Sequence, residues 1–341
     1  MTDHLPGKRI PYFLQSGEGE RFLLGGQLAT FVARMDDTEG PHEGVVISGG
    51  KGSTFPLHAH ESGHEMILVL DGRLDFWLDG RQYSLSRDDY ANVPPKISHG
   101  YRMQGHNTSF LSWTNGGAAR LLHSTLGDPW APHTYPPGLA KGISSERMAR
   151  AEAGADVKFI QSEPPASSPQ APLSKVPDGV VPFVLESGEG QRLVAGDTLF
   201  NIIGQQNNSA GKFLGIMTEG PAGEAIPKHY HDKVMEAFFC VDGCMTLWAG
   251  ESEYQLQPGD FLNVPAGIVH AYRMDAHFTR FFGYLSPGTF ENFFRILGDP
   301  SDNYIFPTDI KSPRFDRVAQ HLAELDVKFV ERPGTTTGAR Q

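Results

Sequence analysis

A repeat that spans the chain constrains its fold more than any other feature of the sequence. The stretch "HAHESGHEMILVLDG" begins at His58, and "HYHDKVMEAFFCVDG" begins at His229, which lies 171 residues later. The same shift superposes "SGEGERF" on "SGEGQRL", "YRMQGH" on "YRMDAH" and one "LGDP" on another, with no net insertion between them. The chain therefore contains two copies of one folding unit.

The length of 341 residues and the repeat together predict two domains. We expect an N-terminal domain at residues 1–160 and a C-terminal domain at residues 180–332. Residues 161–179 are rich in Pro and Ser and predict a linker, and residues 333–341 predict a disordered tail. Each copy ends in a helix-like segment, "SSERMARAEAG" in the first and "SPRFDRVAQHLAEL" in the second.

Apolar alternation and tight-turn signals predict antiparallel strands inside each copy. In "LDGRLDFWLDGRQYSL" the pairs Asp71-Gly72 and Asp79-Gly80 favour hairpin turns, and Leu74, Phe76 and Leu78 alternate with polar or exposed positions. The second copy repeats this pattern as "VDGCMTLWAGESEYQL". Short strands at regular spacing, separated by Gly and Pro turns, predict an all-β fold with a sandwich or barrel in each domain.

The charge and the cysteines exclude several classes of function. With 29 Lys and Arg against 40 Asp and Glu, the net charge of −11 repels phosphate backbones and anionic lipid, so neither nucleic acid nor a membrane is an expected partner. The N-terminal residues lack the apolar region of a secretory signal, and no apolar run is long enough to span a membrane. We therefore expect a cytoplasmic protein. Cys240 and Cys244 flank one turn and are interpreted as structural thiols.

Each copy also carries a set of potential metal ligands. Alternate residues of a strand face the same side, so His58 and His60 can present two imidazoles together. Glu65 follows after four residues, and His99, which follows a Pro-containing turn, is the proposed fourth ligand. Three imidazoles and one carboxylate suit a divalent first-row transition metal and leave positions for water or substrate. The second copy repeats the set as His229, His231, Glu236 and His270.

These residues carry a resemblance to the cupin superfamily. The first cupin motif, G-x5-H-x-H-x4-E-x6-G, is matched by Gly52, His58, His60, Glu65 and Gly72 and again by Gly223, His229, His231, Glu236 and Gly243. The second motif, G-x5-P-x-G-x2-H, is matched by Gly259, Pro265, Gly267 and His270. In the first copy Asp88 and Lys96 replace its glycines, which serve turn geometry rather than metal binding. The resemblance implies two jelly-roll cupin domains in tandem, each with a short C-terminal helical segment.

The chain further resembles the bicupin quercetin 2,3-dioxygenases of the bacterial type, over most of residues 11–330. The resemblance rests on "LVLDG", "DYANVP" and "YRMQGH" in the first copy and on "EAFFCVDG", "PGDF", "FFRILGDP" and "IFP" in the second. It implies an enzyme that opens the central ring of a flavonol such as quercetin with dioxygen and releases carbon monoxide. It also implies one divalent metal ion per domain at the eight ligands named above. Such nitrogen and oxygen ligands accept Fe, Mn, Co, Ni, Cu or Zn.

Glu65 is the candidate catalytic base. A flavonol must lose its 3-hydroxyl proton before it reacts with dioxygen, and a divalent cation acidifies a bound enol strongly. Glu65 can then accept that proton over a hydrogen-bond distance. Its alternative role is that of a purely structural fourth ligand.

Other residues near the motifs are interpreted as structural. His64 adjoins Glu65 but points away from the metal in a regular strand, and His106 and His277 lie beyond a turn from the fourth ligand. The strand that contains Phe76 favours core packing over the lining of a substrate pocket. No substrate-binding residue is assigned.

Two other functions stay open at this point. A bicupin oxalate decarboxylase or oxidase has the same fold and ligand set, but it needs a small polar pocket with an Arg clamp for a dicarboxylate. A pirin-like regulator keeps a metal ion without dioxygen chemistry. The oligomeric state does not follow from the sequence, and a homodimer is one option.

Overall fold

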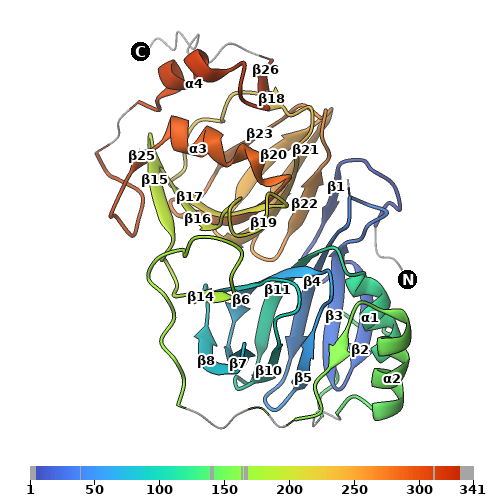
Figure 1. Ribbon diagram of the computed structural model, residues 1–341. Helices are drawn as coiled ribbons and strands as arrows, with labels where there is room; N and C mark the ends of the chain where they lie inside the picture. Colours follow the sequence, from blue (N-terminus) through green and yellow to red (C-terminus); the bar gives the residue numbers. More distant parts are fainter. Residues whose placement is uncertain are drawn as a thin grey trace.

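Antiparallel sheets dominate both halves of the chain (Figure 1). The computed structural model describes residues 5–38, 40–138, 142–162, 164, 168–309 and 312–330. Within these ranges, each half has one eight-stranded and one five-stranded sheet, which pack face to face around an apolar core. The expected all-β architecture of two tandem jelly-roll domains is confirmed.

The first half contributes most strands of one large and one small sheet. In spatial order, the large sheet contains β12 (Asp128–Pro129), β2 (Glu20–Leu24), β3 (Gln27–Ala33), β4 (His42–Gly49), β11 (Thr108–Asn115), β6 (His64–Asp71), β9 (Tyr90–Val93) and β14 (Phe183–Leu185). The small sheet contains β13 (Lys158–Phe159), β5 (Thr54–Ala59), β10 (His99–Met103), β7 (Arg73–Leu78) and β8 (Arg81–Ser86).

The second half repeats this arrangement. Its large sheet contains β1 (Tyr12–Leu14), β22 (Phe261–Val264), β19 (Met235–Asp242), β24 (Thr279–Ser286), β17 (Leu214–Gly220), β16 (Thr198–Gly204), β15 (Gln191–Ala195) and β25 (Asp299–Pro300). Its small sheet contains β21 (Ser252–Leu256), β20 (Met245–Ala249), β23 (His270–Met274), β18 (His229–Tyr230) and β26 (Lys328–Phe329).

The first strand of each half pairs with the large sheet of the other half. β1 lies antiparallel to β22, and β14 lies antiparallel to β9. Between the two large sheets, Trp113 stacks on Tyr284 with ring centroids 4.4 Å apart, inside a core cluster that contains residues of both halves. This exchange joins the halves through backbone hydrogen bonds as well as apolar contact. The domain boundaries at residues 160 and 180 and the linker stay predictions, and residues 333–341 lie outside the described ranges.

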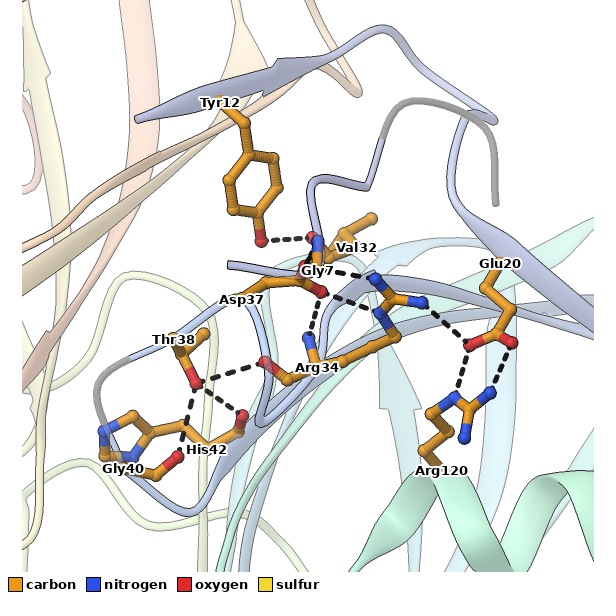
Figure 2. Close-up of polar contacts among 10 residues, drawn as sticks. All are labelled: Gly7, Tyr12, Glu20, Val32, Arg34, Asp37, Thr38, Gly40, His42 and Arg120. Atoms are coloured by element: carbon orange, nitrogen blue, oxygen red, sulfur yellow. Dashed lines mark hydrogen bonds and ion pairs between the residues drawn. The ribbon is translucent and has the colours of Figure 1, made fainter. Parts of the chain in front are cut away.

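A buried polar network fixes the segment that leads into β1 (Figure 2). Asp37 accepts hydrogen bonds from Arg34 Nε at 2.7 Å and from the backbone N–H of Gly7 at 2.7 Å. The Tyr12 hydroxyl donates to the carbonyl of Val32 at 2.8 Å. A buried charge is tolerated only when it is paired and hydrogen-bonded, as the fully buried Asp37 is here. These contacts anchor the crossing segment to the first half.

Short helices cover one end of each half. The first half contains α1 (Ala119–Leu126) and α2 (Ser145–Gly154), and the second contains η1 (Gly288–Phe290), α3 (Glu291–Leu297) and α4 (Phe315–His321). The expected terminal helices correspond to α2 and α4, and α4 is shorter than its segment suggested. In Figure 1 α1 lies beside β2 and β3, so it closes one side of the first domain. None of the helices in the described ranges has the length and apolar character of a membrane span.

One of the two expected hairpin turns has a different role. Asp79 and Gly80, with φ of 49° and 74°, form the predicted two-residue turn between β7 and β8. The prediction for Asp71-Gly72 is wrong, because β6 belongs to the large sheet and β7 to the small one. This turn therefore carries the chain from one sheet to the other. A Cβ on Gly72 would lie 2.3 Å from the carbonyl oxygen of Asn107, so the crossing requires glycine.

Candidate metal centres

The ligands proposed in the first half come together from both of its sheets. His58 on β5 lies directly opposite His99 on β10 in the small sheet, and His60 follows the end of β5. Glu65 on β6 faces them from the large sheet. One ligand atom from each of the four residues lies within 4.8 Å of the others. The four residues predicted from the sequence therefore lie together, and the packing of the small sheet against the large sheet brings them into contact.

Backbone carbonyls fix the tautomer of all three imidazoles. The Nδ1 atoms of His58, His60 and His99 lie 3.0, 2.6 and 3.0 Å from the carbonyl oxygens of Pro56, Asp156 and Ile97. A carbonyl oxygen only accepts, so each Nδ1 must donate and each Nε2 is left with its lone pair. This arrangement is typical of histidines that bind a metal ion through Nε2.

The carboxylate of Asp156 shapes the loop between the second histidine and the glutamate. It accepts backbone N–H groups from Glu61 at 2.9 Å and from Gly63 at 2.8 Å, while its carbonyl holds His60. In the second half Asp326 holds the equivalent loop and His231. Both aspartates begin a "DVKF" stretch that occurs once in each half. Their recurrence was the signal that could have identified them.

The second centre repeats the geometry of the first with one difference. His229 on β18 lies opposite His270 on β23, and His231 completes a cluster whose ligand atoms lie within 4.8 Å of one another. Glu236 on β19 places Oε1 3.3 Å from His231 Nε2 and Oε2 3.3 Å from His270 Nε2. In the first centre, only one oxygen of the glutamate faces the imidazoles.

Burial and the neighbouring groups in each cluster together determine which of its side chains are protonated. Burial, together with the neighbouring imidazoles of His99 and His60, lowers the pKa of His58 well below its usual value. Burial and the neighbouring His270 lower the pKa of His229 to about 3. Burial raises the pKa of Glu65, but the facing imidazoles of His60 and His99 outweigh it and lower that pKa well below its usual value. At neutral pH His58 and His229 are neutral and Glu65 is ionised, which are the forms that bind metal ions.

The donor set in each half fits one metal ion. Three Nε2 lone pairs converge in each cluster, with Glu65 inside the first cluster and Glu236 beside two imidazoles of the second. Acceptors that face one another without a cation between them repel. In the second centre the buried Nε2 atoms of His231 and His270 have no hydrogen-bond partner among the described residues. Unpaired buried polar atoms are rare, and a bound cation would satisfy both. The two centres therefore fit one metal ion per domain.

A cavity adjoins each cluster. The first spans about 450 Å³, including space open to solvent, and apart from the cluster it is lined by apolar side chains and by Ser112, Thr114 and His123. The second spans about 680 Å³, again including space open to solvent. Its wall is aromatic, formed chiefly by Phe200, Phe238, Tyr272, Phe281, Phe290, Phe293, Phe294, Phe315 and Phe329.

Comparison with known proteins identifies the family. The cupin domain family matches residues 45–113 and 215–278, which contain all eight proposed ligands. The chain is 48% identical to quercetin 2,3-dioxygenase of Bacillus subtilis over 331 residues, which is 97% of this chain and 98% of that protein. This chain belongs to the quercetin 2,3-dioxygenase family. It is also 33% identical over 136 residues to quercetin 2,3-dioxygenase of Aspergillus japonicus, covering 37% of this chain and 38% of that one.

Solved structures of other bicupins have the same fold as this chain. The oxalate decarboxylase of Lactobacillus farciminis, in a formate complex, superposes with a TM-score of 0.53. Its sequence is 15% identical, and the match covers 81% of this chain and 85% of that one. At this identity the similarity concerns the fold alone.

The residues interpreted as structural lie outside both clusters. His64 Nε2 contacts Asn92 Oδ1 at 2.9 Å, so His64 points away from the cluster as expected. Phe76 is fully buried in the core and does not line the cavity. His106 and His277 are exposed. The sequence did not indicate that Ser112, Thr114 and His123 line the first cavity, because cavity walls come from strands and helices that are distant in sequence.

Proposed function

We propose that this protein is a metal-dependent dioxygenase that opens the central ring of a flavonol such as quercetin with dioxygen and releases carbon monoxide. The observation that carries the proposal is the pair of buried clusters of three histidines and a glutamate, each beside an apolar cavity. It is supported by the 48% identity to a quercetin 2,3-dioxygenase over nearly the full length of both chains.

The proposed metal ligands are His58, His60, Glu65 and His99 in the first domain and His229, His231, Glu236 and His270 in the second. A divalent transition metal bound there would supply Lewis acidity that makes the 3-hydroxyl of a bound flavonol acidic. Fe, Mn, Co, Ni, Cu and Zn all accept this set of nitrogen and oxygen donors, so metal analysis must identify the ion.

Glu65 is proposed as the base that accepts the 3-hydroxyl proton. Its carboxylate is ionised at neutral pH, and it lines the first cavity among apolar side chains. Proton transfer to a carboxylate within hydrogen-bond distance is a common catalytic step. The apolar wall keeps water away from the electron-rich anion that results.

The lining of the first cavity suits a flat molecule that carries hydroxyl groups. Phe55, Tyr101 and Phe110 supply ring faces, while Thr114 and His123 supply polar groups. The residues equivalent to Thr114 and His123 in the second half are Leu285 and Phe294, which cannot pair with hydroxyl groups. We therefore propose the first domain as the main catalytic site.

Oxalate fits these cavities less well than a flavonol. A dicarboxylate requires a cationic clamp, and no arginine lines either cavity in the described part of the chain. Incubation of the metal-analysed protein with quercetin in air, followed by absorbance and by carbon monoxide release, tests the proposal. A metal-loaded protein that leaves quercetin unchanged would refute it, and oxalate would be the next substrate to assay.

A further inference from the structure

The two glutamates of the metal centres have different neighbours. The Ser112 hydroxyl donates a hydrogen bond to Glu65 Oε1 at 2.5 Å. Ser112 lies on β11 two residues before Thr114, which pairs directly with Glu65, so both side chains face the cavity. The shift of 171 residues places Gly283 of β24 at the equivalent position. The second centre therefore has no hydroxyl at this place.

The hydrogen bond changes how the carboxylate faces the imidazoles. Glu65 keeps Oε2 at 2.9 Å from His99 Nε2 and at 3.7 Å from His60 Nε2, while Oε1 is turned toward Ser112. Glu236 has no such hydroxyl donor among the described residues, and its two oxygens lie at equal distances of 3.3 Å from two imidazoles. The first centre presents one carboxylate oxygen to a cation, and the second presents two.

We propose that Ser112 is a positioning residue that makes the two metal centres unequal. By holding Oε1 of Glu65, it leaves only Oε2 to the metal ion and fixes the carboxylate in the orientation needed at the first site. This inference rests on the proposed metal ligands, and its consequence for turnover rests on the proposed function. Ser112 is buried, with 4% of its surface exposed, so water does not compete for the hydrogen bond.

Variants of Ser112 and of the equivalent Gly283 test the proposal in both halves. Ser112→Ala removes the donor, and the control Ser112→Thr keeps a hydroxyl at the same position. Gly283→Ser introduces a donor in the second half. A Cβ on Gly283 would lie 3.0 Å from the Cγ2 methyl carbon of Ile216, so a serine fits when the branched side chain of Ile216 shifts by a few tenths of an ångström.

The test is the electron paramagnetic resonance spectrum of the full-length protein loaded with two Mn(II) ions. We expect two distinct Mn(II) signals in the parent protein. Ser112→Ala should shift the first signal toward the second. Ser112→Thr, which keeps the hydroxyl, should leave the first signal as it is in the parent. Gly283→Ser should shift the second signal toward the first. Unchanged spectra in Ser112→Ala and Gly283→Ser, with normal melting temperatures, would overturn the proposal whether or not the protein acts on quercetin.

Turnover supplies a second, separate readout. In Ser112→Ala we expect kcat for quercetin to fall about 10-fold while KM changes less than about 2-fold, because a misoriented carboxylate affects the reaction more than binding. A change in KM alone, with an unchanged spectrum, would assign Ser112 to substrate binding and overturn the positioning role. Failure of all variants and the parent to open quercetin would refute the proposed function but leave the spectroscopic test intact.

Discussion

The rings of His58 and His99 lie with their centroids 4.0 Å apart, on residues that face each other directly across β5 and β10. Two buried imidazoles this close, with His60 beside them, form a stable arrangement only when they share a cation or stay neutral. A metal ion bound to these rings would therefore add to the stability of the first domain.

Removal of the metal should destabilise the protein as well as abolish its activity. A metal ion at 100 times its Kd stabilises the folded state by about 2.7 kcal/mol. We expect chelator-treated protein to melt at a lower temperature in calorimetry and to recover when one divalent ion is added back per domain. Identical melting curves with and without metal would contradict the assigned clusters.

The Glu65→Gln variant should fold and bind metal but lose turnover. Glutamine keeps the size of the side chain and an oxygen ligand but cannot accept the substrate proton. We expect kcat to fall about 100-fold or more, in the range attributed to general bases. The matched control is Glu236→Gln, which should have a much smaller effect. Equal turnover of Glu65→Gln and the parent, at equal metal content, would remove the base role.

The two domains should respond unequally to the loss of a ligand. We expect His58→Ala to abolish flavonol cleavage and His229→Ala only to reduce it, because the polar groups suited to a flavonol line the first cavity. Steady-state rates and metal content per chain measure the effect. Strong residual activity in His58→Ala would instead make the larger second cavity the main catalytic site.

The backbone conformation of Lys96, in the turn before His99, should lower the stability of the protein. Lys96 has a φ of +70°, where the equivalent Gly267 has +81°. Residues other than glycine are disfavoured there, so Lys96→Gly should raise the free energy of unfolding by about 0.5 to 1 kcal/mol. The exposed ion pair that Lys96 forms with Glu61 contributes little.

The reverse change provides the control for this turn. Gly267→Ala should lower the free energy of unfolding by about 1 kcal/mol. An added Cβ at Gly267 meets no atom within 4 Å, so backbone strain is the sole cause. Denaturant titration of both variants measures the free energy of unfolding. A Lys96→Gly protein that is less stable than the parent would contradict the prediction that Lys96 strains the backbone.

The acid stability of the first domain should depend on Asp156. Burial raises the pKa of its carboxyl group, but backbone N–H groups of Gly63 and Ser62 outweigh burial and lower it. The group therefore stabilises the fold above its unfolded pKa of about 3.9, and this contribution disappears as the pH falls through the lower folded pKa. Asp156→Asn should melt at a lower temperature than the parent at pH 7, and the difference should shrink below about pH 4. A difference that does not change with pH would contradict this role.

The parts of the site that the sequence predicted correctly are those that local spacing determines. His58 lies on β5 and His60 directly follows this strand, and both are near Glu65 in sequence. The repeat indicated His99 through the equivalent His270 in the second half. Asp88 and Lys96 stand where the motif has turn glycines, and the structure has a φ of +70° at both. These features depend on a few consecutive residues, so a sequence pattern captures them.

The features that were missed depend on contacts between distant segments. The apolar residues of β1 indicate a strand, but they do not indicate that its partner is β22 of the other half. Ser112 is an ordinary polar residue in its own strand and acquires a role only through Glu65 on a neighbouring one. Helix α1 spans only two turns, too short for a clear periodic pattern, yet it brings His123 to the cavity.

The most direct test of the account is the stoichiometry of the reaction with quercetin. Metal-analysed protein is incubated with quercetin under isotopically labelled dioxygen, and carbon monoxide and the ring-opened product are quantified. We predict one carbon monoxide molecule for each quercetin consumed, with both labelled oxygen atoms in the ring-opened product. Unchanged quercetin with both metal centres loaded, or its oxidation without carbon monoxide, would contradict the assignment of this chain as a flavonol ring-opening dioxygenase.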